Sequence, residues 1–221
     1  METLTEIGTR CKTDKATKHK FTQIYEEYYR PFRNEKIRLL EIGIFQGASL
    51  RMWHDYFSQG LIFGIDDCSI EGFNVTPESV KNLENDRLKT FMGDQSNREH
   101  LKKFIEEYSG NFDIIIDDGL HFQEHQQVSL GFLFPHVKSK GTYVIEDLCL
   151  PNRTKEGWGL KDFTNFSDNT TKILDDFKNT ERIVSPYMTE EEMTYLNQHI
   201  IEIKIFRIED ERDMIAFIGK N

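Results

Sequence analysis

One short run, residues 112–121 (FDIIIDDGLH), limits the fold more than any other stretch of this sequence. Its three central isoleucines, residues 114–116, are β-branched and stand between polar residues. This pattern is typical of a strand that is buried on both faces in a parallel sheet. The run ends in Asp117 and Asp118, and His121 follows shortly after. Because ligands of open α/β sheets bind at the carboxyl ends of the strands, these side chains are candidates for a binding site.

The rest of the chain repeats the order strand, then helix. Apolar runs that favour strands lie at residues 37–42, 61–65, 88–92, 112–116 and 143–145, and helical spacing marks residues 21–32, 48–59, 76–83, 98–108 and 123–134. This alternation indicates right-handed crossovers between parallel strands. Two final runs, 200–207 and 213–218, are joined by so short a connection that they must pair antiparallel. We predict an α/β fold with a doubly wound, mostly parallel seven-stranded sheet and an antiparallel last strand.

Length limits the number of domains. A chain of 221 residues can bury one sizeable core and leaves little room for a second. We therefore expect a single domain over residues 1–221, with an N-terminal loop and helix at 1–35. The polar, glycine-containing segment that begins at residue 151 is expected to form a loop or lid over the strand ends, followed by helices, up to residue 198.

Charge and hydropathy exclude several classes of protein. The 28 basic and 38 acidic residues give a net charge of −10, which argues against a nucleic-acid partner. No apolar run approaches the roughly 18 residues of a membrane span, and the first residues lack the pattern of a signal peptide. The three cysteines include no CxxC pair, as expected for a reduced protein. We expect a cytoplasmic location.

The turn after the first predicted strand, residues 41–47 (EIGIFQG), carries two glycines that let the backbone pass close to a ligand. Their G-x-x-x-G spacing departs from the dinucleotide fingerprint, and the following helix lacks the Lys-Ser/Thr pair of a P-loop. Asp66, at the end of the second predicted strand, is placed to accept hydrogen bonds from a ribose, and Asp94, after the third, from an adenine amine. Together they predict a nucleoside ligand. The alternative is that both aspartates only form turns.

These motifs resemble those of the class I S-adenosylmethionine-dependent methyltransferases, which have a Rossmann-like fold. More narrowly, residues 39–43 (LLEIG), 49–53 (SLRMW), 115–121 (IIDDGLH) and 143–147 (YVIED) are similar to the metal-dependent sugar O-methyltransferases of macrolide biosynthesis, the mycinamicin type. The resemblance covers roughly residues 8–150. It implies that the methyl donor, S-adenosylmethionine, is bound by Asp14, Glu41, Gly43, Gly47, Ser49, Asp66, Asp94, Gln95 and Asp117.

The resemblance also implies a metal site between the fourth and fifth strand ends. By position, Asp118, Glu146 and Asp147 would bind Mg²⁺, and His121 would be the general base. Magnesium prefers carboxylate and water ligands, and a metal that holds hydroxyl groups of a sugar lowers the pKa of the acceptor. A neutral imidazole can then remove the proton as the oxygen attacks the methyl group.

Several alternatives at this site stay open. His121 could cap a helix or belong to the core, and His125 could be the base instead. Asp117 could be a structural hydrogen-bond acceptor, because side chains alternate along a strand and Asp117 would point away from Asp118. The pair Glu146 and Asp147 could be a solvated strand end.

A basic segment lies near the N-terminus. Six basic residues crowd into eleven positions, namely Arg10, Lys12, Lys15, Lys18, His19 and Lys20. They form either a solvated face or a contact for an anionic ligand. Thr13-Asp14-Lys15 followed by His19 resembles a Ser/Thr-Asp-Lys element of the same family, near the donor. There Asp14 would accept a hydrogen bond from the methionyl ammonium.

The sequence therefore predicts an S-adenosylmethionine- and Mg²⁺-dependent O-methyltransferase. Its acceptor would be the sugar hydroxyl of a glycan precursor, a sugar nucleotide or a glycosylated small molecule, and a homo-oligomer is compatible with the sequence. Trp158, Phe163 and Phe166 are candidates to stack on this acceptor. Two alternatives remain: an enzyme that methylates a catechol or phenol with the same metal, and a nucleoside-binding protein without catalysis.

Overall fold

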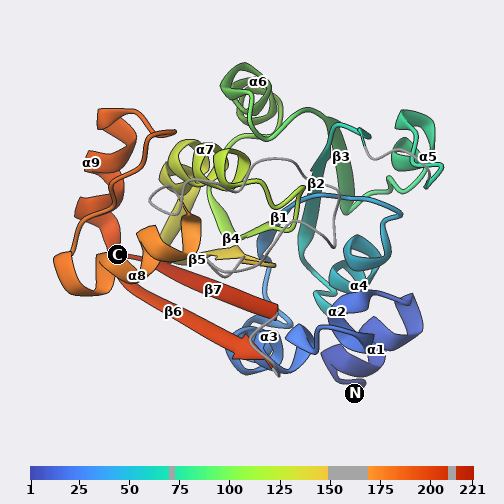
Figure 1. Cartoon of the computed structure of the whole chain (residues 1–221). Helices are drawn as coiled ribbons and strands as arrows, with labels where there is room; N and C mark the ends of the chain where they lie inside the picture. Colours follow the sequence, from blue (N-terminus) through green and yellow to red (C-terminus); the bar gives the residue numbers. More distant parts are fainter. Residues whose placement is uncertain (70–72, 149–168, 209–212) are drawn as a thin grey trace.

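The computed structural model describes residues 1–69, 73–148, 169–208 and 213–221. A seven-stranded sheet forms its centre, with the strand order β3-β2-β1-β4-β5-β7-β6 (Figure 1). The strands are β1 (Arg38–Ile42), β2 (Leu61–Asp66), β3 (Leu88–Met92), β4 (Phe112–Asp117), β5 (Val137–Ile145), β6 (Ile200–Ile208) and β7 (Asp213–Lys220).

Strands β1 to β5 are parallel, and β7 is antiparallel to both of its neighbours, β5 and β6. The predicted mostly parallel sheet is confirmed, as is the antiparallel pairing of the last two strands. After β1 the chain builds outward through β2 and β3, then returns to place β4 on the other side of β1. The order of strands therefore reverses between β1 and β4, and ligands of doubly wound sheets bind at the carboxyl side of such a point.

Helices cover both faces of the sheet (Figure 1). One buried cluster joins the sheet to α1 (Leu4–Cys11), α3 (Phe21–Tyr29), α4 (Ala48–Tyr56) and α5 (Pro77–Lys81). The other joins it to α6 (Arg98–Tyr108), α7 (Gln123–Leu133), α8 (Thr170–Thr180) and α9 (Glu190–His199). Ile114 and Ile116 belong to the first cluster and Ile115 to the second, because neighbouring side chains of a strand point to opposite faces. Burial on both faces explains the unbroken apolar run of β4.

The N-terminal segment is more helical than its polar sequence predicted. Residues 4–11 form α1, which begins with a capping box between Thr3 and Glu6 and buries Leu4 and Ile7. A single turn, α2 (Asp14–Thr17), follows and begins after Thr13. The aromatic helix α3 ends at Tyr29 and continues as a 3₁₀ turn, η1 (Arg30–Phe32), which contains Pro31. A second 3₁₀ turn, η2 (Phe134–His136), follows α7.

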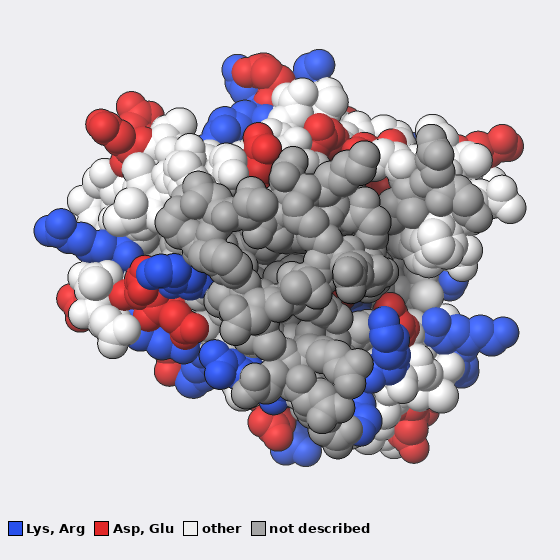
Figure 2. Space-filling view, viewed as in Figure 1, with Lys and Arg blue, Asp and Glu red and all other residues white. Residues whose placement is uncertain are grey.

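The described helices, surface charges and cysteines can be compared with the sequence-based predictions. Within the described ranges, no helix is both long enough and apolar enough to cross a membrane. On the face in Figure 2, basic and acidic side chains are interspersed around the rim. Cys11 and Cys68 are free thiols. Cys149 and the three aromatic candidates Trp158, Phe163 and Phe166 lie outside the described residues, so their predicted roles stay predictions.

We predict that Leu39→Ala lowers the free energy of unfolding by about 2–5 kcal/mol, because it removes a side chain that is fully buried in β1 and leaves a cavity. Leu61→Ala in the neighbouring strand β2 is the matched control, since Leu61 is 38% exposed, and it should cost less than about 1 kcal/mol. Urea denaturation measures both values. Equal losses would contradict the burial of Leu39.

Candidate functional site

A pocket opens at the carboxyl ends of strands β1 to β4. Its lining includes Gly43, Asp66, Asp94, Gln95 and Asp118, all of which the sequence singled out. The other lining residues are Ile42, Phe45, Ile65, Asp67, Gly93, Gly119, Leu120 and His125. The pocket thus lies at the point where the order of strands reverses.

Gly43 allows two of the loops that line the pocket to touch. Its φ of +89° lies in the left-handed region, and a Cβ atom there would be 2.1 Å from the carbonyl oxygen of Asp118. Gly47 also has a positive φ, +73°, and its missing side chain leaves room for Leu83. Gly47 immediately precedes α4. Gly43 thus brings the backbone after β1 against the backbone after β4, and Gly47 lets the same turn pack on Leu83.

Asp66 binds the loop after the neighbouring strand β1, whereas Asp94 binds within its own turn. Asp66 Oδ2 accepts hydrogen bonds from the backbone N–H groups of Ile44, at 2.6 Å, and Phe45, at 2.9 Å. Asp94 Oδ1 accepts from the backbone N–H and the hydroxyl of Ser96. Asp66 Oδ1 also accepts a hydrogen bond from the backbone N–H of Cys68, at 2.6 Å, so both aspartates form turns. Both residues line the pocket as well. The turn-forming interpretation is therefore compatible with a ligand contact, which stays a prediction.

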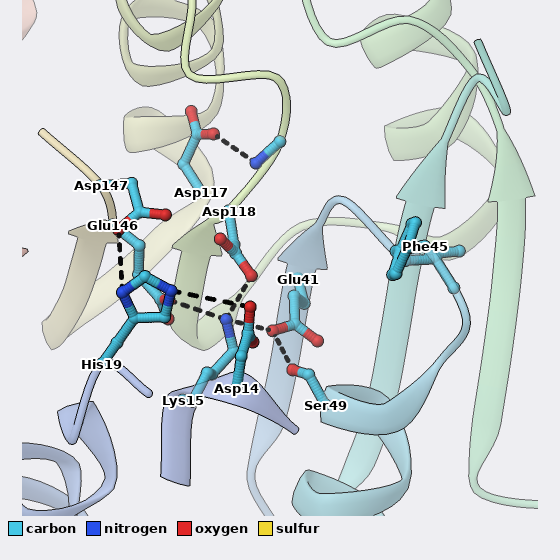
Figure 3. A network of polar contacts seen from close by, with 12 residues as sticks. Asp14, Lys15, His19, Glu41, Phe45, Ser49, Asp117, Asp118, Glu146 and Asp147 are labelled. Carbon is cyan, nitrogen blue, oxygen red and sulfur yellow. Dashed lines mark hydrogen bonds and ion pairs between the residues drawn. The ribbon is translucent and has the colours of Figure 1, made fainter. Parts of the chain in front are cut away.

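Asp117 is fully buried and points away from Asp118, as strand alternation predicts (Figure 3). Its carboxylate accepts hydrogen bonds from Gln95 Nε2, at 2.9 Å, and from the hydroxyl of Ser129, at 2.5 Å. Gln95 in turn packs so closely on Gly119 that a Cβ atom at Gly119 would lie 1.7 Å from Gln95 Oε1. These contacts favour the interpretation of Asp117 as a structural acceptor that supports the pocket wall through Gln95.

Lys15 lies buried between three strand ends (Figure 3). It is 1% exposed, and its ammonium forms ion pairs with Asp118, with Glu146 Oε2 at 2.7 Å and with Glu41 Oε1 at 3.4 Å. These carboxylates follow or end β4, β5 and β1. His19 of the same basic segment is also buried. Of the two interpretations of the basic segment, a solvated face is therefore wrong for Lys15 and His19. It holds for Lys12, Lys18 and Lys20, which are exposed.

The charges of this cluster do not balance. Burial lowers the pKa of Lys15, but the three carboxylates outweigh burial and raise this pKa well above its usual value. Burial, together with the charge of Asp118, raises the pKa of Glu146 well above its usual value. When all four groups are ionised, one ammonium faces three carboxylates. A further cation would compensate the excess negative charge.

A group of metal-ligating side chains adjoins Lys15. Asp118, His121 and Asp147 each offer one ligand atom, and these atoms lie within 4.8 Å of one another. His121 Nε2 is 3.6 Å from Asp147 Oδ2, and His19 Nδ1 is 3.7 Å from Asp147 Oδ1. The backbones of His121 and Asp147 have positive φ angles of 58° and 48°. Such strained conformations cluster at functional sites.

Glu146 is next to this group in the sequence but points to the N-terminal segment. Its Oε2 binds Lys15, and its Oε1 accepts a hydrogen bond from the hydroxyl of Tyr25, a residue of α3. It is buried, which argues against a solvated strand end. His125 lines the pocket and packs against Phe122.

Glu41 lies between Lys15 and helix α4. It is fully buried, and its Oε1 accepts hydrogen bonds from the side chains of Ser49 and Trp53. Its Oε2 has no hydrogen-bond partner among the described residues. Buried carboxylate oxygens are almost always paired, so this atom is a candidate acceptor for a ligand. Asp14 lies nearby, and its side chain is largely exposed (Figure 3).

Sequence reasoning missed the roles of Lys15 and Tyr25. Lys15 was noticed only as part of the basic segment and of the Thr13-Asp14-Lys15 element. Tyr25 lies in the predicted helix 21–32 and is fully buried, and its hydroxyl also binds Glu146. For Tyr25 the signal was a polar hydroxyl at a position with core spacing, whereas the sequence around Lys15 carries no such signal.

Comparisons with known proteins were made by sequence and by structure. No protein-family model matches the chain. Demethylmacrocin O-methyltransferase of Streptomyces fradiae is 42% identical over 153 residues, which is 66% of this chain and 36% of that protein. The 8-demethyl-8-(2-methoxy-alpha-L-rhamnosyl)-tetracenomycin-C 3'-O-methyltransferase of Streptomyces olivaceus is 40% identical over 153 residues, which again make up 66% of this chain and 36% of that protein. The chain thus spans just over a third of these curated relatives.

A solved structure matches the whole chain. The MycE methyltransferase from the mycinamycin biosynthetic pathway, in complex with Mg, SAH and mycinamycin VI, superposes with a TM-score of 0.76 and 30% sequence identity. The match covers 100% of this chain and 55% of that chain. The similarity includes the seven-stranded sheet with its reversed strand.

We predict that Gly43→Ala lowers the free energy of unfolding by about 2–4 kcal/mol, from the left-handed backbone and the clash with Asp118 together. Gly219→Ala is the control, because φ is ordinary there and the nearest atom to an added Cβ is 3.4 Å away. Chemical denaturation compares the two variants. If Gly43→Ala is as stable as Gly219→Ala, the two loops do not touch as described.

Proposed function

We propose that this chain transfers a methyl group from S-adenosylmethionine to a sugar hydroxyl with the help of Mg²⁺. It has the fold of the class I S-adenosylmethionine-dependent methyltransferases, and it is related to the macrolide sugar O-methyltransferases. The observation that carries this proposal is the position of Asp118. Asp118 lines the pocket and also belongs to the group of metal-ligating side chains. A methyl donor in the pocket and an acceptor held at the metal would therefore be neighbours.

The polar groups of the pocket support a nucleoside donor. Gly43 and Gly47 shape its wall, because they let the turn after β1 pack against the backbone of Asp118 and the side chain of Leu83. Glu41 presents a buried oxygen without a partner among the described residues, suited to the methionyl ammonium. Asp66 and Asp94 face the pocket at the ends of β2 and β3, where they would hold the ribose and the adenine.

The remaining predicted donor residues would act from positions around the pocket. Gln95 would contact the adenosine from the pocket wall, and Asp117 would hold Gln95 in place. Ser49 would fix Glu41 through their hydrogen bond, and Asp14 would approach the methionyl end from α2.

The acidic group fits a hard divalent cation. Its carboxylates offer oxygen ligands, which Mg²⁺ prefers, and its excess negative charge would be compensated by the ion. In the proposed ligand set Asp118 and Asp147 face each other beside His121, and Glu146 adds its charge from the buried side. When bound, the ion would orient the hydroxyl groups of the acceptor and lower their pKa. MycE, the solved relative, contains Mg and SAH.

His121 is the proposed general base. Its ring faces the carboxylate of Asp147, which would orient the imidazole and stabilise the imidazolium that forms when it accepts the proton. His125 lies on the pocket wall and is absent from the group of possible ligands among the described residues, so it is the weaker candidate.

The proposed acceptor is a sugar. The name of the Streptomyces olivaceus relative specifies a rhamnosyl substrate, and a sugar with adjacent hydroxyls can bind a metal through two oxygens. A catechol could bind in the same way, and only a test of acceptors separates the two.

We expect His121→Ala to reduce methyl transfer at least about 100-fold, because the acceptor would lose its base, while S-adenosylhomocysteine binds as to the wild type. The control is His199→Ala. His199 ends α9, directly before β6. The start of β6 pairs with the end of β7, away from the carboxyl ends of β4 and β5 where the candidate site lies. Methyl transfer and calorimetric binding are the two measurements. Full activity of His121→Ala would remove His121 from the mechanism, and lost donor binding would make its role structural.

Thorough chelation should abolish methyl transfer to a rhamnosyl glycoside, and Mg²⁺ should restore it, because the acceptor needs the ion to lose its proton. The assay runs the glycoside and a catechol side by side with S-adenosylmethionine. Turnover of the catechol alone would contradict a sugar acceptor. Activity that survives chelation would argue against the metal, and donor binding without any turnover of either acceptor would support a binding protein.

A further inference from the structure

We propose that Lys15 weakens the binding of a divalent cation by the proposed metal ligands Asp118, Glu146 and Asp147. Its ammonium competes with that cation for the carboxylates of Asp118 and Glu146. The inference rests on the proposed function, since it concerns the metal site of that reaction. It assigns to Lys15 a fixed positive charge that sets how tightly the metal is held.

The contacts of Lys15 make it a fixed charge. An ammonium has three N–H donors, and Lys15 has three carboxylate neighbours, one within β1 and one directly after each of β4 and β5. With 1% of its surface exposed, the side chain is shielded from water, which would otherwise screen the charge. Two of the three neighbours, Asp118 and Glu146, are proposed metal ligands. The third, Glu41, lies on the donor side.

The backbone around Lys15 holds the ammonium in this place. The single turn α2 packs against α1 at Gly8, where a Cβ atom would lie 2.8 Å from Ala16 Cβ. Thr13, which precedes α2, is buried, and the turn closes through the hydrogen bond from Lys18 N–H to Asp14 O, at 2.8 Å. The side chain of Lys15 therefore cannot swing into solvent without displacing α2.

The same N-terminal segment reaches each proposed ligand. Lys15 binds Asp118 and Glu146, Tyr25 donates a hydrogen bond to Glu146, and His19 lies 3.7 Å from Asp147. The ligands are thus held from the side of α2 and α3 by groups that donate hydrogen bonds or carry positive charge. Of these groups, Lys15 has the permanent charge, so its effect on a cation is mainly electrostatic repulsion.

Repulsion and positioning predict opposite results. If Lys15 mainly repels the cation, removing its charge should tighten metal binding by about tenfold or more, since two positive charges a few ångströms apart interact strongly at a shielded site. If Lys15 only keeps the carboxylates in place, removing it should weaken metal binding or leave it unchanged. The sign of the change therefore decides between the two.

The experiment measures Mn²⁺ affinity by electron paramagnetic resonance, on the full chain at pH 8 and without an acceptor. Lys15→Met removes the charge, Lys15→Gln removes it but keeps a hydrogen-bond donor, and Lys15→Arg keeps it. Lys18→Met is the matched control, because Lys18 ends the same turn but is exposed. We expect at least about tenfold tighter binding to the Met and Gln variants, and values within about threefold of the wild type for the Arg and control variants.

Unchanged or weaker binding to a folded Lys15→Gln protein would overturn the proposal. Circular dichroism establishes folding, and Lys15→Gln decides the matter if Lys15→Met does not fold. A measurement on the wild type covers the case in which neither variant folds: the ¹⁵N signal of the Lys15 ammonium should shift when Mg²⁺ is added. An unshifted signal would equally overturn the proposal.

The outcomes separate this inference from the proposed function. If the wild type binds Mn²⁺ and the Lys15 variants do not bind it more tightly, only the inference fails. If neither the wild type nor any folded variant binds Mn²⁺, both the inference and the metal requirement of the proposed reaction fail.

Discussion

The candidate site depends on the balance of charge at three strand ends. Glu41, Asp118 and Glu146 are carboxylates that the sheet brings together in a region with little access to water, and Lys15 is the ammonium that compensates part of their charge. Burying an unpaired carboxylate costs several kcal/mol, and breaking a buried pair typically costs about 3–5 kcal/mol. The N-terminal segment must therefore pack on the sheet before the acidic cluster can exist in this form. The site belongs as much to α2 and α3 as to the strand ends.

The topology of the sheet explains why these residues meet. The order of strands reverses between β1 and β4, so the loops after these strands diverge to opposite faces and leave a pocket between them. Gly43 brings the two loops into backbone contact at Asp118. Asp118 consequently faces the pocket and the acidic cluster at once. The proposed methyl transfer would need the donor in the pocket and the acceptor at the metal to lie side by side. The contact between Gly43 and Asp118 would place these two sites next to each other.

Much of the fold could be predicted from the sequence, because it follows from local patterns. The three isoleucines of β4 indicate burial on both faces, and the alternation of strands and helices indicates a parallel sheet. Helix α1 was missed although Thr3, Glu6 and the spacing of Leu4 and Ile7 carried its signal. The orientation of Asp117 away from Asp118 was also predictable from the alternation of side chains.

The site was less predictable, because its chemistry depends on contacts between distant residues. Nothing near Lys15 in the sequence shows that residues 41, 118 and 146 surround it, and a lysine among other basic residues is usually solvated. Asp66 and Asp94 accept local hydrogen bonds from the backbone N–H groups of Cys68 and Ser96, which a turn-forming role explains equally well, so their ligand contacts stay predictions. The predicted aromatic contacts to the acceptor stay predictions as well, since residues 158, 163 and 166 lie outside the described part of the chain.

The most direct test of the central claim, that donor and metal meet at Asp118, is a crystal structure with S-adenosylhomocysteine and Mn²⁺, in which anomalous scattering locates the ion. We expect the carboxylates of Asp118 and Asp147 to bind the ion, and the sulfur of the donor product to lie in the pocket beside Gly43. An ion bound elsewhere, or a donor product outside this pocket, would contradict it.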